Sequence, residues 1–114
     1  MQSHGGGAIA NISTFSAFEP SLSFPVSSAL RAGLAGFAKM YSDRFVEDGI
    51  RMNNVLPVLM DSYPESDATM ARIPARRYGR VEELAATVAF LLSPDAAYVN
   101  GQNIRVDGGP TRSM

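Results

Sequence analysis

Residues 25–57 have the sequence PVSSALRAGLAGFAKMYSDRFVEDGIRMNNVLP. Proline in the first turn suits the start of a helix, with Ser23 before it as a cap. No second proline occurs until the stretch ends, and an Asp-Gly pair supplies the glycine that often ends a helix. The run after this pair is largely apolar and stops at proline. The stretch therefore predicts a helix over 26–47 and a strand over 50–56.

Two stripes run along the predicted helix at spacings of three and four residues. The apolar stripe comprises Leu30, Leu34, Phe37, Tyr41 and Phe45. The second stripe has small residues and comprises Ala29, Gly33, Gly36 and Met40. Glycine inside a helix costs about 1 kcal/mol relative to alanine, so we expect a second helix to pack tightly against these glycines.

The regions on either side extend the pattern. A mainly apolar run predicts a first strand over 8–13, buried on both faces of a sheet. Residues 15–23 are rich in serine and aromatic residues without a period, so we expect a connection across the end of the sheet. Residues 58–78 are expected to form a mobile connection, with one or two helical turns around 66–72.

The remainder predicts one more helix and one more strand. Glu82 and Glu83 suit a first helical turn, because carboxylates oppose the positive end of the helix dipole. Pro94 ends this helix. Its expected buried face comprises Leu84, Val88, Leu91 and Leu92. An alternating run then predicts a strand over 102–106.

The order strand-helix-strand-helix-strand is typical of an α/β fold with a parallel sheet. We expect a partial Rossmann-like, doubly wound sheet in a single domain over 1–114. In such folds ligands bind beyond the carboxyl ends of the strands. These ends are expected at Ser13-Thr14, Pro57-Val58 and Asp107-Gly108-Gly109.

Composition limits the classes of function. Ten basic and eleven acidic residues give a net charge of −1, which argues against nucleic acid or a membrane as a partner. The chain has no cysteine and one histidine, His4, so we expect no disulfide, thiolate nucleophile or metal site. No apolar run approaches the ~20 residues that span a bilayer, and the first residues lack the features of a secretory signal. We expect a cytoplasmic protein.

Several motifs occur in the order in which one family has them. They are Asn11-Ile12-Ser13-Thr14, the runs 27–37 and 49–57, the run 77–83, and the run 98–109. Nearly the whole chain resembles the C-terminal half of a short-chain dehydrogenase/reductase. The resemblance implies a nicotinamide cofactor, NAD or NADP, and hydride transfer at a carbonyl or alcohol carbon of a small molecule.

The resemblance also implies a serine, a tyrosine and a lysine for the proton chemistry, and it places these at Thr14, Ser27 and Arg31. These three are the candidate catalytic residues. Threonine keeps a hydroxyl donor, and arginine keeps a positive charge but does not release a proton. Serine lacks the acidity and the reach of a phenol, so we expect proton transfer by this chain to fail.

The candidate cofactor-binding residues, by the same resemblance, are Arg31, Pro57, Val58, Leu59 and Ser62. The family usually has glycine at the position of Val58, where it admits the backbone close to the nicotinamide. A Gly-rich turn that opens a helix and holds the pyrophosphate is absent, because Gly5–Gly7 precedes a strand. We therefore do not expect the chain alone to bind the cofactor, and we expect a truncated form of the fold.

Other interpretations stay open. One edge of the first strand and one side of the long helix would lack neighbours, so the chain could be an interaction module. Its partner would be a second copy, giving a homo-oligomer, or a separate N-terminal half. With an arginine at the lysine position, the chain also resembles the halohydrin dehalogenases, which use this fold without nicotinamide. Those enzymes still rely on the tyrosine. Taken singly, Thr14, Ser27 and Arg31 also suit ordinary turn and helix-surface roles.

Overall fold

The structure, a computed structural model, describes residues 1–113. The strands are β1 (Gly7–Ile12), β2 (Ile50–Pro57) and β3 (Asn103–Val106). The α-helices are α1 (Pro25–Phe45), α2 (Asp67–Met70) and α3 (Val81–Leu92). Short 3-10 turns are η1 (Gln2–His4), η2 (Phe15–Ala17), η3 (Val46–Asp48) and η4 (Pro94–Ala96).

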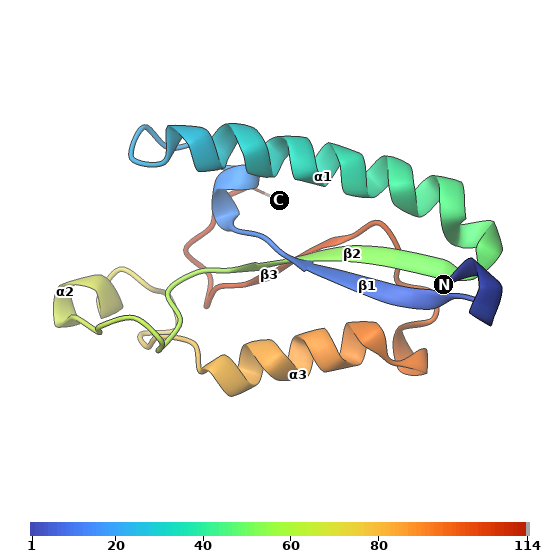
Figure 1. The fold of residues 1–114 in the computed structure, drawn as a ribbon. Coiled ribbons are helices and arrows are strands. Elements are labelled where there is room, and N and C mark those ends of the chain that lie inside the picture. The colour runs from blue at the N-terminus through green and yellow to red at the C-terminus, as the bar shows by residue number, and fades with distance from the viewer. Residues whose placement is uncertain (114) are drawn as a thin grey trace.

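The strands form one parallel sheet in the order β1-β2-β3. The register aligns Gly7 with Ile50 and Asn54 with Asn103. Helix α1 covers one face of the sheet and α3 covers the other (Figure 1). The core lies between β2 and α3 and is centred on Val55, Leu91 and Ala96. The predicted α/β fold with a parallel sheet is confirmed.

Strand β1 lies at an edge of this sheet and begins one residue earlier than predicted. The prediction of burial on both faces is wrong, because none of its residues is buried and Ile12 is 49% exposed. Within residues 1–113, β1 pairs with β2 alone. Among the described residues, no strand lies along its other side.

Helix α1 begins at Pro25, one residue before the predicted start, and the predicted cap is wrong. Phe24 precedes the helix and no side chain caps it. The Ser28 hydroxyl donates instead to the carbonyl oxygen of Phe24 at 2.7 Å, which satisfies a backbone acceptor at the helix entry. The helix ends at Phe45, earlier than predicted, because η3 tightens the last turn before Gly49, whose φ of 75° is left-handed as expected.

The most deeply buried residues of α1 are small. They are Ser28, Ala38 and Ser42. Two members of the predicted apolar stripe, Leu30 and Phe37, are 68% and 53% exposed. The other three, Leu34, Tyr41 and Phe45, are half-buried. A Cβ built on Gly33 or Gly36 would meet nothing within 4 Å. The expected tight packing of a second helix is therefore not found among residues 1–113.

Helix α3 and its surroundings follow the prediction closely. Glu83 accepts the backbone N–H of Arg80 at 3.0 Å, which satisfies one of the free amides at the helix start. Leu91 is buried, but Leu92 is 47% exposed, so its predicted burial is wrong. Successive residues lie about 100° apart around a helix, and only one of this pair faces the core. Helix α2 confirms the short helix expected around 66–72.

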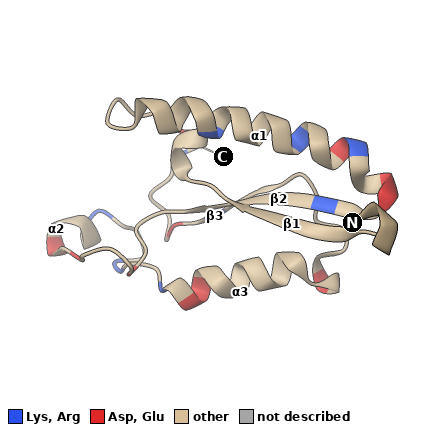
Figure 2. Cartoon of the chain, in the orientation of Figure 1, with Lys and Arg blue, Asp and Glu red and all other residues tan. Residues whose placement is uncertain are grey.

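Charged residues lie mainly towards the ends of the helices and in the connections (Figure 2). Before Lys39, α1 carries a single charged residue, Arg31. Over the described part of the chain, every helix is too short or too polar to cross a membrane.

Candidate functional site

The carboxyl ends of the strands lie at the same end of the sheet as the start of α1 (Figure 1). Thr14 follows β1 closely, Val58 follows β2 and Asp107 follows β3. These are the neighbourhoods in which the sequence predicts a ligand.

A pair of serine hydroxyls joins the connection after β1 to α1. Ser16, in η2, is 1% exposed, and its Oγ shares a hydrogen bond of 3.2 Å with the Oγ of Ser27. Thr14 precedes η2 in an extended backbone conformation and is half-buried. Ser16 was not predicted as a site residue, although its hydroxyl comes shortly after the strand-end threonine in the sequence.

Arg31 lies one turn after Ser27 and reaches the end of β1. Its guanidinium donates a long hydrogen bond of 3.5 Å to the carbonyl oxygen of Ile12. None of the carboxylates in residues 1–113 forms an ion pair with it. Because arginine stays protonated in proteins, this end of the sheet carries a fixed positive charge.

Backbone hydrogen bonds hold the connection after β2. The N–H of Val58 donates to the carbonyl oxygen of Val106 at 3.2 Å, which places it beside β3. Leu59 has a φ of 55°, a left-handed conformation that side chains with a Cβ rarely adopt. Its carbonyl oxygen accepts the N–H of Gly79 at 3.0 Å, and this contact holds the strained residue. Ser62 is exposed on the surface beyond it.

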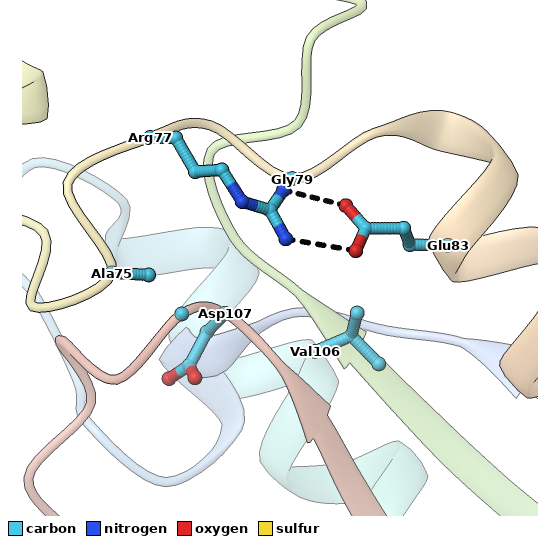
Figure 3. Close-up of a pocket in the computed structure, with 7 residues that line it drawn as sticks. Ala75, Arg77, Gly79, Glu83, Val106 and Asp107 are labelled. Atoms are coloured by element: carbon cyan, nitrogen blue, oxygen red, sulfur yellow. Dashed lines mark hydrogen bonds and ion pairs between the residues drawn. The ribbon is translucent and has the colours of Figure 1, made fainter.

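A small cavity lies beside the carboxyl end of β3 and the start of α3 (Figure 3). Arg77 and Glu83 line it and form a two-point ion pair, with N–O distances of 2.6 and 2.8 Å. The hydrogen bond from Arg77, assisted by the amide of Arg80, lowers the pKa of Glu83 to about 2. The cavity volume is about 90 Å³. A water molecule takes about 30 Å³ in the liquid, so this cavity admits a few waters but no nicotinamide ring.

Asp107 orders the chain after β3. Its carboxylate accepts the N–H of Gly109 at 2.9 Å and both the N–H and the hydroxyl of Thr111. Partial burial alone would raise the pKa of Asp107, but these donors outweigh burial and hold the pKa below its usual range. The structure thus gives Asp107 a role in forming a turn.

A wider hollow of about 550 Å³ opens where the connection after β1 meets the start of α1. It is lined by Pro20, Ser21, Leu22, Pro25, Ser28 and Ala29. Leu22 is 99% exposed, so the described residues form an open surface here and not an enclosed site.

Comparison with known proteins identifies the family. Residues 1–111 match the family model described as enoyl-(acyl carrier protein) reductase. The chain belongs to the short-chain dehydrogenase/reductase family. The resemblance found in the sequence motifs is confirmed.

Relatives in this family are longer than the chain. The 2-dehydro-3-deoxy-D-gluconate 5-dehydrogenase of Bacillus subtilis is 30% identical over 118 residues, an alignment that covers 96% of this chain and 46% of the relative. The 3-oxoacyl-(acyl-carrier-protein) reductase FabG of Vibrio cholerae is 36% identical, and the alignment covers 72% of this chain and 36% of the relative. A solved Agrobacterium tumefaciens structure with bound NADP is 30% identical and has a TM-score of 0.86. The match covers 96% of this chain and 48% of that chain. The chain spans less than half the length of each.

Neither long helix of this short-chain dehydrogenase/reductase chain opens on a Gly-rich turn within residues 1–113. A pyrophosphate is held by a Gly-rich turn that opens a helix. Here α1 begins at Pro25 after Phe24, α3 follows Arg80, and Gly5–Gly7 leads into β1. No three His, Asp or Glu side chains within residues 1–113 are grouped to hold a metal ion.

Proposed function

We propose that this chain forms the C-terminal half of an NAD- or NADP-dependent oxidoreductase that acts at a carbonyl or alcohol carbon of a small molecule. One observation carries the proposal: the parallel sheet gathers the family's strand ends with Thr14, Ser27 and Arg31 beside them. The reaction class is supported by relatives that are named as dehydrogenases and reductases.

We propose further that the 114 residues alone are inactive. The hydroxyl of Ser27 shares its hydrogen bond with Ser16, and an aliphatic hydroxyl is a far weaker acid than a phenol. Arg31 supplies a charge but no proton relay. The branched side chain of Val58 occupies the position at which the family's glycine would let the nicotinamide approach.

Calorimetric titration of the chain with NADH and with NADPH tests this proposal. We expect no heat of binding at micromolar concentrations of either nucleotide. Micromolar binding of one of them would refute the inactivity of the isolated chain. A full-length relative from the family, titrated under the same conditions, serves as the positive control.

A matched variant separates the two causes of inactivity. Ser27→Tyr combined with Arg31→Lys restores the family's residues but adds no pyrophosphate turn. We expect the double variant to bind no better than the natural chain. If it binds either nucleotide, the replaced side chains, and not the absent turn, account for the defect.

We infer a second candidate function, an interaction module, from the uncovered side of α1. The exposed apolar residues on this helix are Val26, Leu30, Phe37 and Met40. Each is at least 53% exposed, and Gly33 and Gly36 leave open space among them. A contiguous apolar surface of this kind favours association, and small residues let a second helix approach closely. The open edge of β1 offers a separate N-terminal half a strand to pair with.

Light scattering measures this association directly. We expect a mass above that of one 12.2 kDa chain at micromolar concentration. A monomeric mass together with a cooperative thermal transition would count decisively against the interaction module.

A further inference from the structure

The chain after β3 turns back over the connection that follows β1. In Figure 1 the C-terminal end lies beside η2, under α1. Glu19, close after η2, accepts the backbone N–H of Arg112 and that of Ser113, the latter at 2.9 Å. Hydrogen bonds from amides to a carboxylate are charge-assisted and stronger than neutral ones, so these contacts form a firm tie between distant segments.

Arg105 on β3 makes a second tie between the same segments. Its guanidinium donates to the Ser113 hydroxyl at 2.6 Å and lies 5.8 Å from the ring centroid of Phe18, within the range of a cation–π contact. The Nε of Arg105 is buried without a partner in the described residues. If the hydrogen bond to Ser113 were broken, more of the Arg105 guanidinium would lack a partner. Arg105 therefore favours the conformation in which the segment after β3 lies against the connection that follows β1.

The base of the tail is also fixed. Asp107 accepts hydrogen bonds from Gly109 and Thr111, which turn the chain towards η2. Residues 108–113 are therefore held at one end by Asp107 and at the other by Glu19.

These contacts have a consequence for the candidate site because η2 carries Ser16. The segment is held on one side by α1, through the hydrogen bond between Ser16 and Ser27. It is held on the other side by the tail, through Glu19. A shift of the tail would move the hydroxyl of Ser16 relative to that of Ser27.

We propose that Glu19 is a positioning residue and that residues 108–113 act as a latch, which sets the place of Ser16 against Ser27 from the far end of the chain. This proposal rests on the proposed function only in treating Ser16 and Ser27 as part of the functional site. The hydrogen bonds of the latch form within the chain, whichever ligand the site accepts.

Hydrogen–deuterium exchange on the 114-residue chain tests the latch. In Glu19→Ala we expect amides in 15–24 and 108–113 to exchange about tenfold faster, because two charge-assisted bonds are lost, while β2 and α3 keep their rates. Glu19→Gln retains an acceptor oxygen and should restore the natural rates to within about threefold. Glu65→Ala removes an exposed carboxylate elsewhere and should change nothing in these segments. Unchanged exchange in Glu19→Ala, or no rescue by glutamine, would overturn the latch.

A second pair of variants approaches the same bond from the tail. Arg112→Pro removes the N–H that donates to Glu19, whereas Arg112→Ala removes the side chain and keeps the N–H. We expect the proline variant to reproduce the exchange pattern of Glu19→Ala and the alanine variant to match the natural chain. Equal behaviour of the two would refute a role for the backbone donor. This pair keeps the latch testable if Glu19→Ala fails to fold.

Positioning is distinguished from general stabilisation by a double-mutant cycle. In the natural chain, Ser27→Ala should reduce the folding equilibrium constant about fivefold. If Glu19 positions Ser16, Ser27→Ala should have almost no effect on the folding equilibrium constant in the Glu19→Ala background, because the hydroxyl pair is already disturbed. Additive losses would show that Glu19 stabilises the chain without positioning the site. Nucleotide titration is not used here, so failure of the proposed function would leave this result interpretable.

Discussion

At the scale of single residues, the hydroxyl pair of Ser16 and Ser27 gives the first prediction. We expect Ser27→Ala to lower the free energy of unfolding by about 1 kcal/mol, because the hydroxyl of Ser16 is buried and loses its partner. Urea unfolding measures the change. Ser23→Ala is the matched control, since that side chain is exposed, and it should have little effect. Equal losses in the two variants would contradict this role for Ser27.

The ion pair between Arg77 and Glu83 gives a prediction about pH. The hydrogen bond from Arg77 lowers the pKa of Glu83 from 4.5 to about 2 in the folded chain. The pair therefore stabilises the fold above pH 4.5, and this contribution is lost as the pH falls towards 2. The pair is exposed to solvent, so we expect Glu83→Gln to lower the melting temperature at pH 7 by only about 1–4 °C.

Melting curves between pH 7 and pH 2 check this prediction. The difference between the natural chain and Glu83→Gln should disappear between pH 4.5 and pH 2. Glu82→Gln, next to it and without an ion pair in the described residues, should show no such trend. A difference that persists at pH 2 would mean that Glu83 acts through packing and not through its charge.

The sequence could place some site residues and not others, for a physical reason. The sequence predicts that the first strand ends near Thr14, and in the structure Thr14 follows β1. Arg31 was predicted only from the family resemblance, and its guanidinium donates to the carbonyl oxygen of Ile12 at the end of that strand. Glu19 was not predicted, because its partners, Arg112 and Ser113, are distant in the sequence. Periodicity describes one element at a time and cannot show which elements a polar side chain will connect.

At the scale of elements, α1 gives a prediction through its glycines. A Cβ on Gly33 meets nothing within 4 Å, and alanine is the better helix former. We expect Gly33→Ala to raise the free energy of unfolding of the monomeric chain by about 0.5–1 kcal/mol, measured in urea at low protein concentration.

The control for this prediction is a glycine in a different conformation. Gly49 has a φ of 75°, and a Cβ there would lie 2.8 Å from the carbonyl oxygen of Gly5. Gly49→Ala should therefore destabilise the chain. A loss of stability in Gly33→Ala as well would mean that the exposed side of α1 packs closely even in the monomer.

The elements themselves were predicted to within a few residues, but the buried residues of α1 were not. The sequence of α1 shows an apolar stripe and a stripe of small residues, yet its most deeply buried residues, Ser28, Ala38 and Ser42, belong to neither. Small residues there let the helix lie close to β2, an advantage that a hydrophobic pattern does not record. Asn53 is similarly buried because it donates to Val99 and accepts from Gln102, both at 2.9 Å, across a long stretch of sequence.

At the scale of the whole molecule, the chain is extended for its length. Its radius of gyration is 15.3 Å, with extents of 49 × 28 × 22 Å. A compact domain of this length is expected to have a radius of gyration of about 13 Å. An extended shape leaves a large share of its apolar surface in water, including the edge at Ile12 and the outer side of α1. This shape fits a unit that gains stability by association.

Association through α1 gives the last prediction. Phe37→Lys and Met40→Lys place charges on the exposed apolar side of the helix, where they would have to lose water in any interface. We expect either change to reduce the mass measured by light scattering towards that of one chain, while circular dichroism keeps its helical signal. Tyr98→Lys is the control, because Tyr98 is fully exposed and lies outside α1. If Tyr98→Lys reduces the mass as strongly, the loss of association is not specific to the apolar side of α1, and this prediction is contradicted.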